Sequence, residues 1–310
     1  MWFAYSIGAA VFRAVKDAGY KLLLENSGSL EAVFCFWIFT LAVLVPSACV
    51  RIAYLKSHGR AIVGDQRRAL QGLLGAGLLD IFAYWSFMEA LKRGDLSIAL
   101  PLRNLVPLFG LFVGMKMLKE RLGPTVVIGT LFVVGGVLIM HVQAANSDAA
   151  WGIFAAMTNP ASLLAMGSAF LFAWSAMCNR VAVAPEYGKM DVIVFTASLI
   201  TLSTIGYGVL VILIGNPGEV ALMIRENYGA LGVIGVLGAI GSLLTALAFS
   251  SGEMTKVVPA LRMQIPIGII IGGLFLHEKE FATRFAGGIL LTVGVVLIAI
   301  ASALRKGKSR

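Results

Sequence analysis

Long apolar stretches alternate with short polar segments along the whole chain. Each stretch holds about 20 residues, which is the length of helix that crosses the hydrocarbon core of a bilayer. The pattern predicts ten transmembrane spans, over residues 2–24, 31–50, 70–91, 97–117, 125–142, 162–184, 192–214, 229–250, 257–276 and 284–304. We therefore expect an all-α integral membrane protein whose short loops leave no room for a soluble catalytic domain.

Composition narrows the class of protein further. Of the 310 residues, 59% are hydrophobic and only 13% are charged, whereas a soluble domain is about 25% charged and would aggregate with so much apolar surface. The Cys and His residues are scattered along the chain, so neither a disulfide framework nor a metal site is expected. Because the sequence also lacks nucleotide-binding and hydrolase motifs, we expect no enzyme and no cofactor.

The net charge of +9 has a simple explanation in a membrane protein, since cytoplasmic loops collect Lys and Arg. With both termini in the cytoplasm, that side carries more than twice as many Lys and Arg residues as the other side. The positive-inside rule therefore predicts cytoplasmic termini in the plasma (cytoplasmic) membrane, with a basic tail at 305–310 and an external linker at 143–161. Nucleic acid is not an expected partner.

The chain repeats itself after 158 residues, and this is the strongest pattern in the sequence. The matching pairs include Pro101/Pro259, Gly110/Gly268, Glu120/Glu278, Gly129/Gly287 and Gly136/Gly294. With a slip of one residue, Arg103 and Pro107 also match Arg262 and Pro266. Each half, 1–142 and 162–304, holds five spans, and because five is odd the halves insert with opposite topology. Two inverted five-helix repeats are typical of transporters that alternate access around a midplane site.

These repeated stretches resemble a known family. Residues 99–107, 118–122 and 135–138 resemble the EamA-type repeat of the drug/metabolite transporter superfamily, and residues 259–266, 276–279 and 287–294 resemble it again. The resemblance implies a ten-helix transporter whose spans 1, 3, 4, 6, 8 and 9 line a central cavity. It leaves the substrate open, because the family carries amino acids, sugars, nucleotide sugars, sugar phosphates and drugs.

Ionisable side chains inside a membrane span are costly, and each is by default a candidate for function. Away from the span ends these are Arg13, Lys16, Asp17, Asp80, Arg103 and Arg262. The cations outnumber the anions, so the surplus positive charge predicts an anionic or zwitterionic solute. Arg103 and Arg262 are the leading candidates, because a guanidinium fits carboxylate or phosphate groups. The alternative for Arg103 is a structural ion pair with Asp80.

The first and third spans supply further candidates. In the first span Asp17 lies four residues after Arg13, and mutual neutralisation within the helix is the alternative to a functional role for this pair. Lys16 is then expected to lack a partner, which makes it a third anion contact beside Arg13. Asp80 is a candidate for carrying a coupling proton, with Asp17 as a second one, and a counter-ion role is equally expected for both.

Aromatic and amide side chains complete the candidate pocket. Tyr84, Trp174, Asn179 and Gln264 are suited to ring stacking and hydrogen bonding with a solute, while core packing is the commoner fate of a single aromatic residue. Pro107 and Pro266 remove helix hydrogen bonds and are expected to act as bending points.

Together these features predict a secondary transporter, either an exporter or an exchanger, of a small organic anion or zwitterion by alternating access. Two alternatives stay open: a proton-coupled exporter of cationic drugs or amines that uses Asp17 or Asp80, and a lipid-handling flippase. The expected partners are the solute and the lipid bilayer, and a homodimer is compatible with the sequence.

Overall fold

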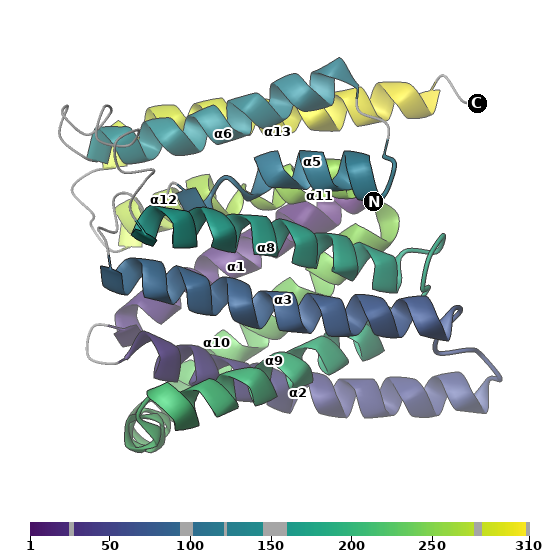
Figure 1. Cartoon of the computed structure of the whole chain (residues 1–310), viewed down its shortest axis with the longest axis vertical. Helices are drawn as coiled ribbons and strands as arrows, with labels where there is room; N and C mark the ends of the chain where they lie inside the picture. The colour runs from purple at the N-terminus through teal and green to yellow at the C-terminus, as the bar shows by residue number, and fades with distance from the viewer. Residues whose placement is uncertain (25–27, 94–101, 121–122, 145–159, 276–280, 308–310) are drawn as a thin grey trace. The chain divides into compact units, whose positions relative to one another are not determined.

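In the computed structural model the described residues are 1–24, 28–93, 102–120, 123–144, 160–275 and 281–307. Within them the regular elements are α-helices and no strand occurs (Figure 1). The helices are α1 (Trp2–Leu24), α2 (Ser29–Ser57), α3 (Gln66–Arg93), α5 (Val106–Met117), α6 (Pro124–Ala144), α8 (Pro160–Val183), α9 (Val192–Ile214), α10 (Pro217–Ser251), α11 (Met254–Leu261), α12 (Gln264–Phe275) and α13 (Phe281–Gly307). Within the described residues every predicted span lies mainly in helix, although turns interrupt the spans 97–117 and 257–276, and this confirms the all-α fold.

Six helical segments among the described residues are long and apolar enough to cross a membrane. They are Leu30–Ser57, Gln66–Ala90, Pro160–Val183, Val192–Ile214, Pro217–Ser251 and Met254–Ile271. Large apolar side chains on them are exposed, for example Ile212 at 74%, as expected of a surface that faces lipid. The chain is therefore an integral membrane protein, as its composition predicts.

The chain divides into two compact units. Unit 1 consists of residues 1–81 and 178–251, and unit 2 of residues 82–177 and 252–310. Both α3 and α8 contribute to each unit, so each unit contains parts of both predicted repeats. The units are defined by packing and the repeats by sequence, and the boundaries predicted for the repeats stay a prediction.

In unit 1, α10 packs against α1, α2 and α9. Glycine allows this close approach: a Cβ atom on Gly238 would lie 2.4 Å from the ring of Phe36. The start of α10 is fixed by the buried carboxylate of Glu31, whose Oε1 accepts a hydrogen bond from the backbone N–H of Asn216 at 2.7 Å. Sequence analysis missed this carboxylate, which satisfies a donor at a helix N-terminus.

In unit 2, α6 and α13 form the largest helix contact. A Cβ atom on Gly129 would lie 2.7 Å from the carbonyl oxygen of Gly294, and one on Gly136 would lie 2.5 Å from that of Gly287. The 158-residue shift exchanges these two contacts, because it relates Gly129 to Gly287 and Gly136 to Gly294. Two-fold related halves would make such contacts, while the inverted topology itself stays a prediction.

Two helices of unit 2 begin immediately after a break in the chain's helical path. A turn at Asn104–Leu105 precedes α5, and a turn at Arg262–Met263 separates α11 from α12. Hydrogen bonds of the shorter i to i+3 kind close each turn, from Leu105 N to Leu102 O at 3.2 Å and from Arg262 N to Pro259 O at 3.0 Å. The breaks lie just before Pro107 and Pro266, near the expected bending points, because proline is tolerated at the start of a helix.

Candidate functional site

Three aromatic rings of unit 2 surround the guanidinium of Arg103. Its central carbon lies 4.2 Å from the ring centre of Phe87, 5.2 Å from that of Phe172 and 5.3 Å from that of Tyr84. The rings of Tyr84 and Phe172 also meet edge to face, with centres 6.2 Å apart. We call these three residues the aromatic cage of Arg103.

Two helices position the cage. Tyr84 and Phe87 are three residues apart on α3 and therefore share one face of that helix. The buried hydroxyl of Ser168 on α8 donates to the carbonyl oxygen of Ala83 on α3 at 2.7 Å, which holds the two helices close together and brings Phe172 beside Tyr84. Interhelical bonds of this kind contribute about 0.6 kcal/mol in a membrane.

The cage stabilises the charge of Arg103 through the ring faces, which provide no oxygen acceptor. Each cation–π contact contributes about 0.5–2 kcal/mol, depending on how far the pair is desolvated. A guanidinium has five N–H donors, which lie in its plane rather than on its faces. Among the described residues of unit 2, aromatic rings rather than carboxylates contact Arg103. The expected alternative, an ion pair with Asp80 of unit 1, stays a prediction.

The second arginine of the site, Arg262, forms a hydrogen bond between the two turns that interrupt the helices. Nη1 of Arg262, in the turn after α11, donates to Oδ1 of Asn104, in the turn before α5, at 3.3 Å. Both side chains are half-buried, as is Gln264 at the start of α12. Sequence analysis missed Asn104, although the 158-residue shift relates it directly to Arg262; the one-residue slip matched Arg262 with Arg103 instead.

Glu120 fixes the opposite end of α11. Its carboxylate accepts hydrogen bonds from the backbone N–H groups of Met254 and Thr255 at 2.8 and 2.9 Å, and from the Thr255 hydroxyl at 2.7 Å. This satisfies donors at the helix N-terminus. Since α5 and α11 pack together, the pair is tied near one end by Glu120 and near the other by the Asn104–Arg262 bond. The equivalent Glu278 lies outside the described residues.

Trp174 belongs to a second row of rings in unit 2. It meets Phe170 edge to face at 5.4 Å, and Phe170 meets Phe109 of α5 in the same way at 5.8 Å. Among the predicted site residues, Tyr84 therefore contacts Arg103, and Arg262 contacts Asn104. Trp174 contacts Phe170 instead.

The charged candidates of unit 1 are arranged differently. Nζ of Lys16 lies 2.7 Å from the carboxylate of Asp17 and 4.8 Å from the ring centre of Phe36. The expectation that Lys16 lacks a partner is therefore wrong, because its long side chain reaches the adjacent residue. The half-buried Arg13 experiences the negative charges of Asp17 and Asp80.

Asn179 and Asp80 are also half-buried parts of unit 1. The phenol of Tyr207 donates to the backbone carbonyl oxygen of Asp80 at 3.5 Å, which is a long and weak hydrogen bond. Tyr207 in turn stacks on Trp37, with ring centres 6.3 Å apart. The roles predicted for Asn179, Asp80 and Asp17 in binding or coupling stay predictions.

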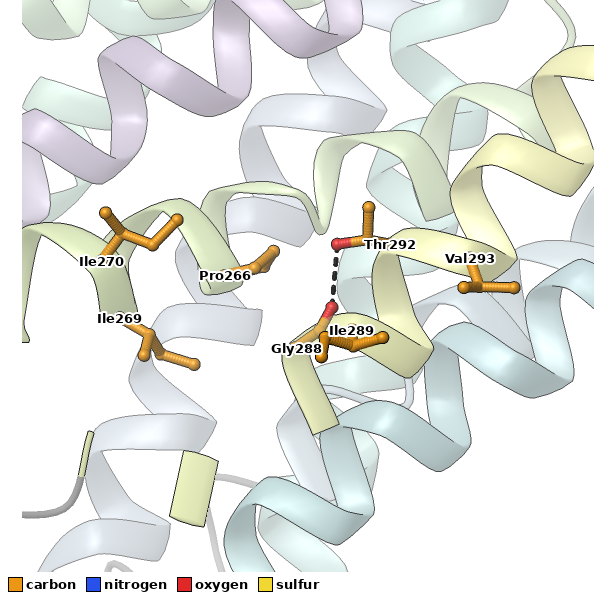
Figure 2. Close-up of a pocket in the computed structure, with 7 residues that line it drawn as sticks. All are labelled: Pro266, Ile269, Ile270, Gly288, Ile289, Thr292 and Val293. Carbon is orange, nitrogen blue, oxygen red and sulfur yellow. Dashed lines mark hydrogen bonds between the residues drawn. The ribbon is translucent and has the colours of Figure 1, made fainter. Parts of the chain in front are cut away.

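A pocket between α12 and α13 has a nearly apolar lining. Figure 2 shows its seven lining residues, Pro266, Ile269, Ile270, Gly288, Ile289, Thr292 and Val293. Its one hydroxyl, on Thr292, donates to the carbonyl oxygen of Gly288 at 2.8 Å. The pocket therefore offers little to orient a charged solute. Among the described residues, no cluster of His, Cys, Asp and Glu is suited to hold a metal ion.

Comparisons with known proteins agree with this architecture. Residues 1–142 match the model of the EamA-like transporter family. A solved structure described only as "Crystal structure of protein" is similar over 97% of this chain and 96% of its own, with a TM-score of 0.68 and 14% identity. That likeness shows the fold alone. No curated protein matches the sequence. Residues 1–142 of this chain are therefore similar to the EamA-like transporter family, which is a family of membrane transporters.

Proposed function

We propose that the protein transports a small organic anion or zwitterion, and that Arg103 contacts the negative group of the solute. One observation carries this proposal: the Arg103 guanidinium lies over three aromatic rings, and these rings offer no oxygen acceptor to its N–H donors. A cation within a membrane protein costs several kcal/mol unless it is compensated. A carboxylate from the solute would compensate it through paired hydrogen bonds.

The Asn104–Arg262 bond supports a second contact for the solute. Both residues lie at breaks between helical segments, and transporters bind solutes at such discontinuous helices. The amide of Asn104 is neutral, so its bond to Arg262 is weaker than a bond to a carboxylate. An anion that reaches this turn therefore offers Arg262 a stronger acceptor than Asn104 does.

We further propose alternating access by two inverted repeats, with both termini in the cytoplasm. The exchange of the Gly129–Gly294 and Gly136–Gly287 contacts under the 158-residue shift supports the two-fold relation. The positive-inside rule supports the orientation. Asp80 is the proposed carrier of a coupling proton, while the pairing of Asp17 with Lys16 leaves Asp17 less suited to bind a cationic drug.

Thermal stabilisation of the purified protein tests the solute class. The panel contains carboxylates, phosphates, amino acids, sugars and amines, and a ligand that binds the folded state raises the melting temperature. We expect anions or zwitterions to stabilise the wild type but not Arg103→Ala. The exposed Arg225 provides a matched control, since Arg225→Ala should respond like the wild type. Stabilisation by amines alone, or an unchanged anion response in Arg103→Ala, would overturn the proposal.

A further inference from the structure

The region where α2 ends and α3 begins contains more Lys and Arg residues than carboxylates that could pair with them. The carboxylates of this region are Asp65, Glu186 and Asp191, and each has an arginine partner. Arg51 Nη2 lies 2.9 Å from Asp191, Arg68 Nε lies 3.4 Å from Asp65, and Arg180 Nη2 lies 2.5 Å from Glu186. Asp191 and Asp65 also cap the helices α9 and α3 with their side chains. These three pairs therefore serve the fold.

Four exposed cations remain in the same region, and we call them the basic cluster: Lys56, Arg60, Arg67 and Lys189. Within the part of the chain that the structure describes, none of the four forms an ion pair with a carboxylate. Their positive charge is therefore balanced only by solvent or by a ligand.

Backbone hydrogen bonds hold the two loops of the basic cluster together. The N–H groups of Gly64 and Asp65 both donate to the carbonyl oxygen of Gly188, at 3.2 and 3.0 Å, and Asp191 N donates to Ile62 O at 2.9 Å. A Cβ atom on Gly64 would lie 3.0 Å from the Cβ of Lys189. The backbone that carries Lys189 is therefore held beside the loop that joins α2 to α3.

A stripe of exposed leucines continues from the basic cluster along α3. Leu70, Leu74 and Leu78 are exposed by 51%, 44% and 50%, and they follow Arg67 at intervals of three and four residues. These intervals place all four side chains on one face of the helix. Because α3 crosses the membrane, this face presents a cation at one end and an apolar surface beyond it.

We propose that the basic cluster binds the headgroup of an anionic phospholipid, with an acyl chain along Leu70, Leu74 and Leu78. Charge complementarity selects the headgroup, since clustered Lys and Arg next to a membrane helix attract anionic lipids. The leucine stripe adds apolar contact that a free anion lacks. The proposal concerns unit 1 alone and does not depend on the identity of the transported solute.

Native mass spectrometry of the purified full-length protein tests this proposal. The probes are dioleoyl phosphatidylglycerol and dioleoyl phosphatidylcholine, which differ in headgroup charge. We expect the wild type to prefer phosphatidylglycerol. In Lys56→Gln/Arg60→Gln/Arg67→Gln/Lys189→Asn this preference should fall by at least about tenfold and by up to about 600-fold, because each cation near a headgroup contributes up to about fivefold. Asn is chosen at position 189 because Lys189 has a φ of 48°, which Asn tolerates.

A matched variant controls for loss of charge in general. Lys116→Gln/Lys119→Asn/Lys306→Gln/Lys308→Gln removes four cations elsewhere, and Lys119 also has a positive φ, of 54°. This variant should keep the preference of the wild type. An equal loss in both variants, or no loss in the first, would overturn the proposal. If the first variant misfolds, Arg67→Gln/Lys189→Asn gives the same comparison with a smaller expected fall of about 5- to 25-fold.

Soluble anions distinguish a lipid site from a site for free phosphate. Inorganic phosphate and glycerol phosphate carry an anionic phosphate group, as the headgroup does, but no acyl chains. We expect neither to displace phosphatidylglycerol at equal concentration, because neither contacts the leucine stripe. Displacement by either one would assign the basic cluster to a free anion and contradict the proposal.

Discussion

Arg180 in unit 1 and Arg103 in unit 2 are held in opposite ways. Arg180 is buried, donates through Nη1 to the carbonyl oxygen of Phe249 at 2.9 Å, and pairs through Nη2 with Glu186. Arg103 is half-buried and contacts the faces of Phe87, Phe172 and Tyr84. Oxygen atoms of the protein therefore accept from both terminal nitrogens of Arg180, whereas Arg103 lies over aromatic rings.

This difference separates a structural cation from a candidate binding cation. Phe249 lies close to the C-terminus of α10, so Arg180 satisfies a carbonyl that the helix leaves without a partner. Aromatic rings compensate charge only partly, and they offer no oxygen acceptor to the N–H donors of a guanidinium. Where a membrane protein holds a cation in this way, a solute can complete its coordination.

Replacing Arg180 should have the largest effect on stability. Arg180→Met leaves the carbonyl of Phe249 and the carboxylate of Glu186 without this donor, and we expect the free energy of unfolding to fall by about 1–3 kcal/mol. Thermal melting in detergent measures the change. A melting temperature equal to that of the wild type would show that Arg180 does not stabilise the fold. It would then contradict the contrast drawn between Arg180 and Arg103.

The same substitution at Arg103 should have a much smaller effect on the fold. Arg103→Met loses three cation–π contacts but also removes a cation that is costly in a membrane protein. These terms oppose each other, so we expect a change in the free energy of unfolding within about 1 kcal/mol. A loss as large as that of Arg180→Met would show that Arg103 stabilises the fold instead.

Phe87 provides a way to weaken the aromatic cage. Its ring is the nearest to the Arg103 guanidinium, and Phe87→Leu keeps an apolar side chain while removing the π face. The dissociation constant of a stabilising anion should rise about fivefold, corresponding to about 1 kcal/mol. Isothermal titration calorimetry would measure this rise, and an unchanged constant would show that the cage does not position Arg103.

Tyr84 should give the smallest effect on solute binding. Tyr84→Phe keeps the ring that faces Arg103 and removes only the hydroxyl group, so the cage survives. We expect the anion affinity to change by less than about twofold. A larger loss in the same titration would indicate that the Tyr84 hydroxyl itself binds the solute.

Sequence patterns predicted the helices well because apolar length and proline positions are local properties. The breaks before Pro107 and Pro266 follow from the missing N–H of proline. The membrane location follows from composition alone. Glu120, one of the residues that the 158-residue repeat matches, caps α11.

The contacts of the candidate site were harder to predict because they join distant segments. Phe87 and Phe172 lie on different helices, and no periodicity relates them. Asn104 was missed because the repeat had been aligned with a one-residue slip at Arg103. The Lys16–Asp17 pair was missed because adjacent helical residues point in different directions, whereas the lysine side chain is long enough to span that difference.

The central claim is that Arg103 contacts the negative group of the transported solute, and uptake into proteoliposomes tests it most directly. The anion that stabilises the purified wild type most strongly would be supplied to wild type, Arg103→Ala and the control Arg225→Ala. We predict uptake by the wild type and the control, and a loss of at least about tenfold in Arg103→Ala, as expected for one lost charged hydrogen bond. Equal uptake by all three proteins would contradict the account.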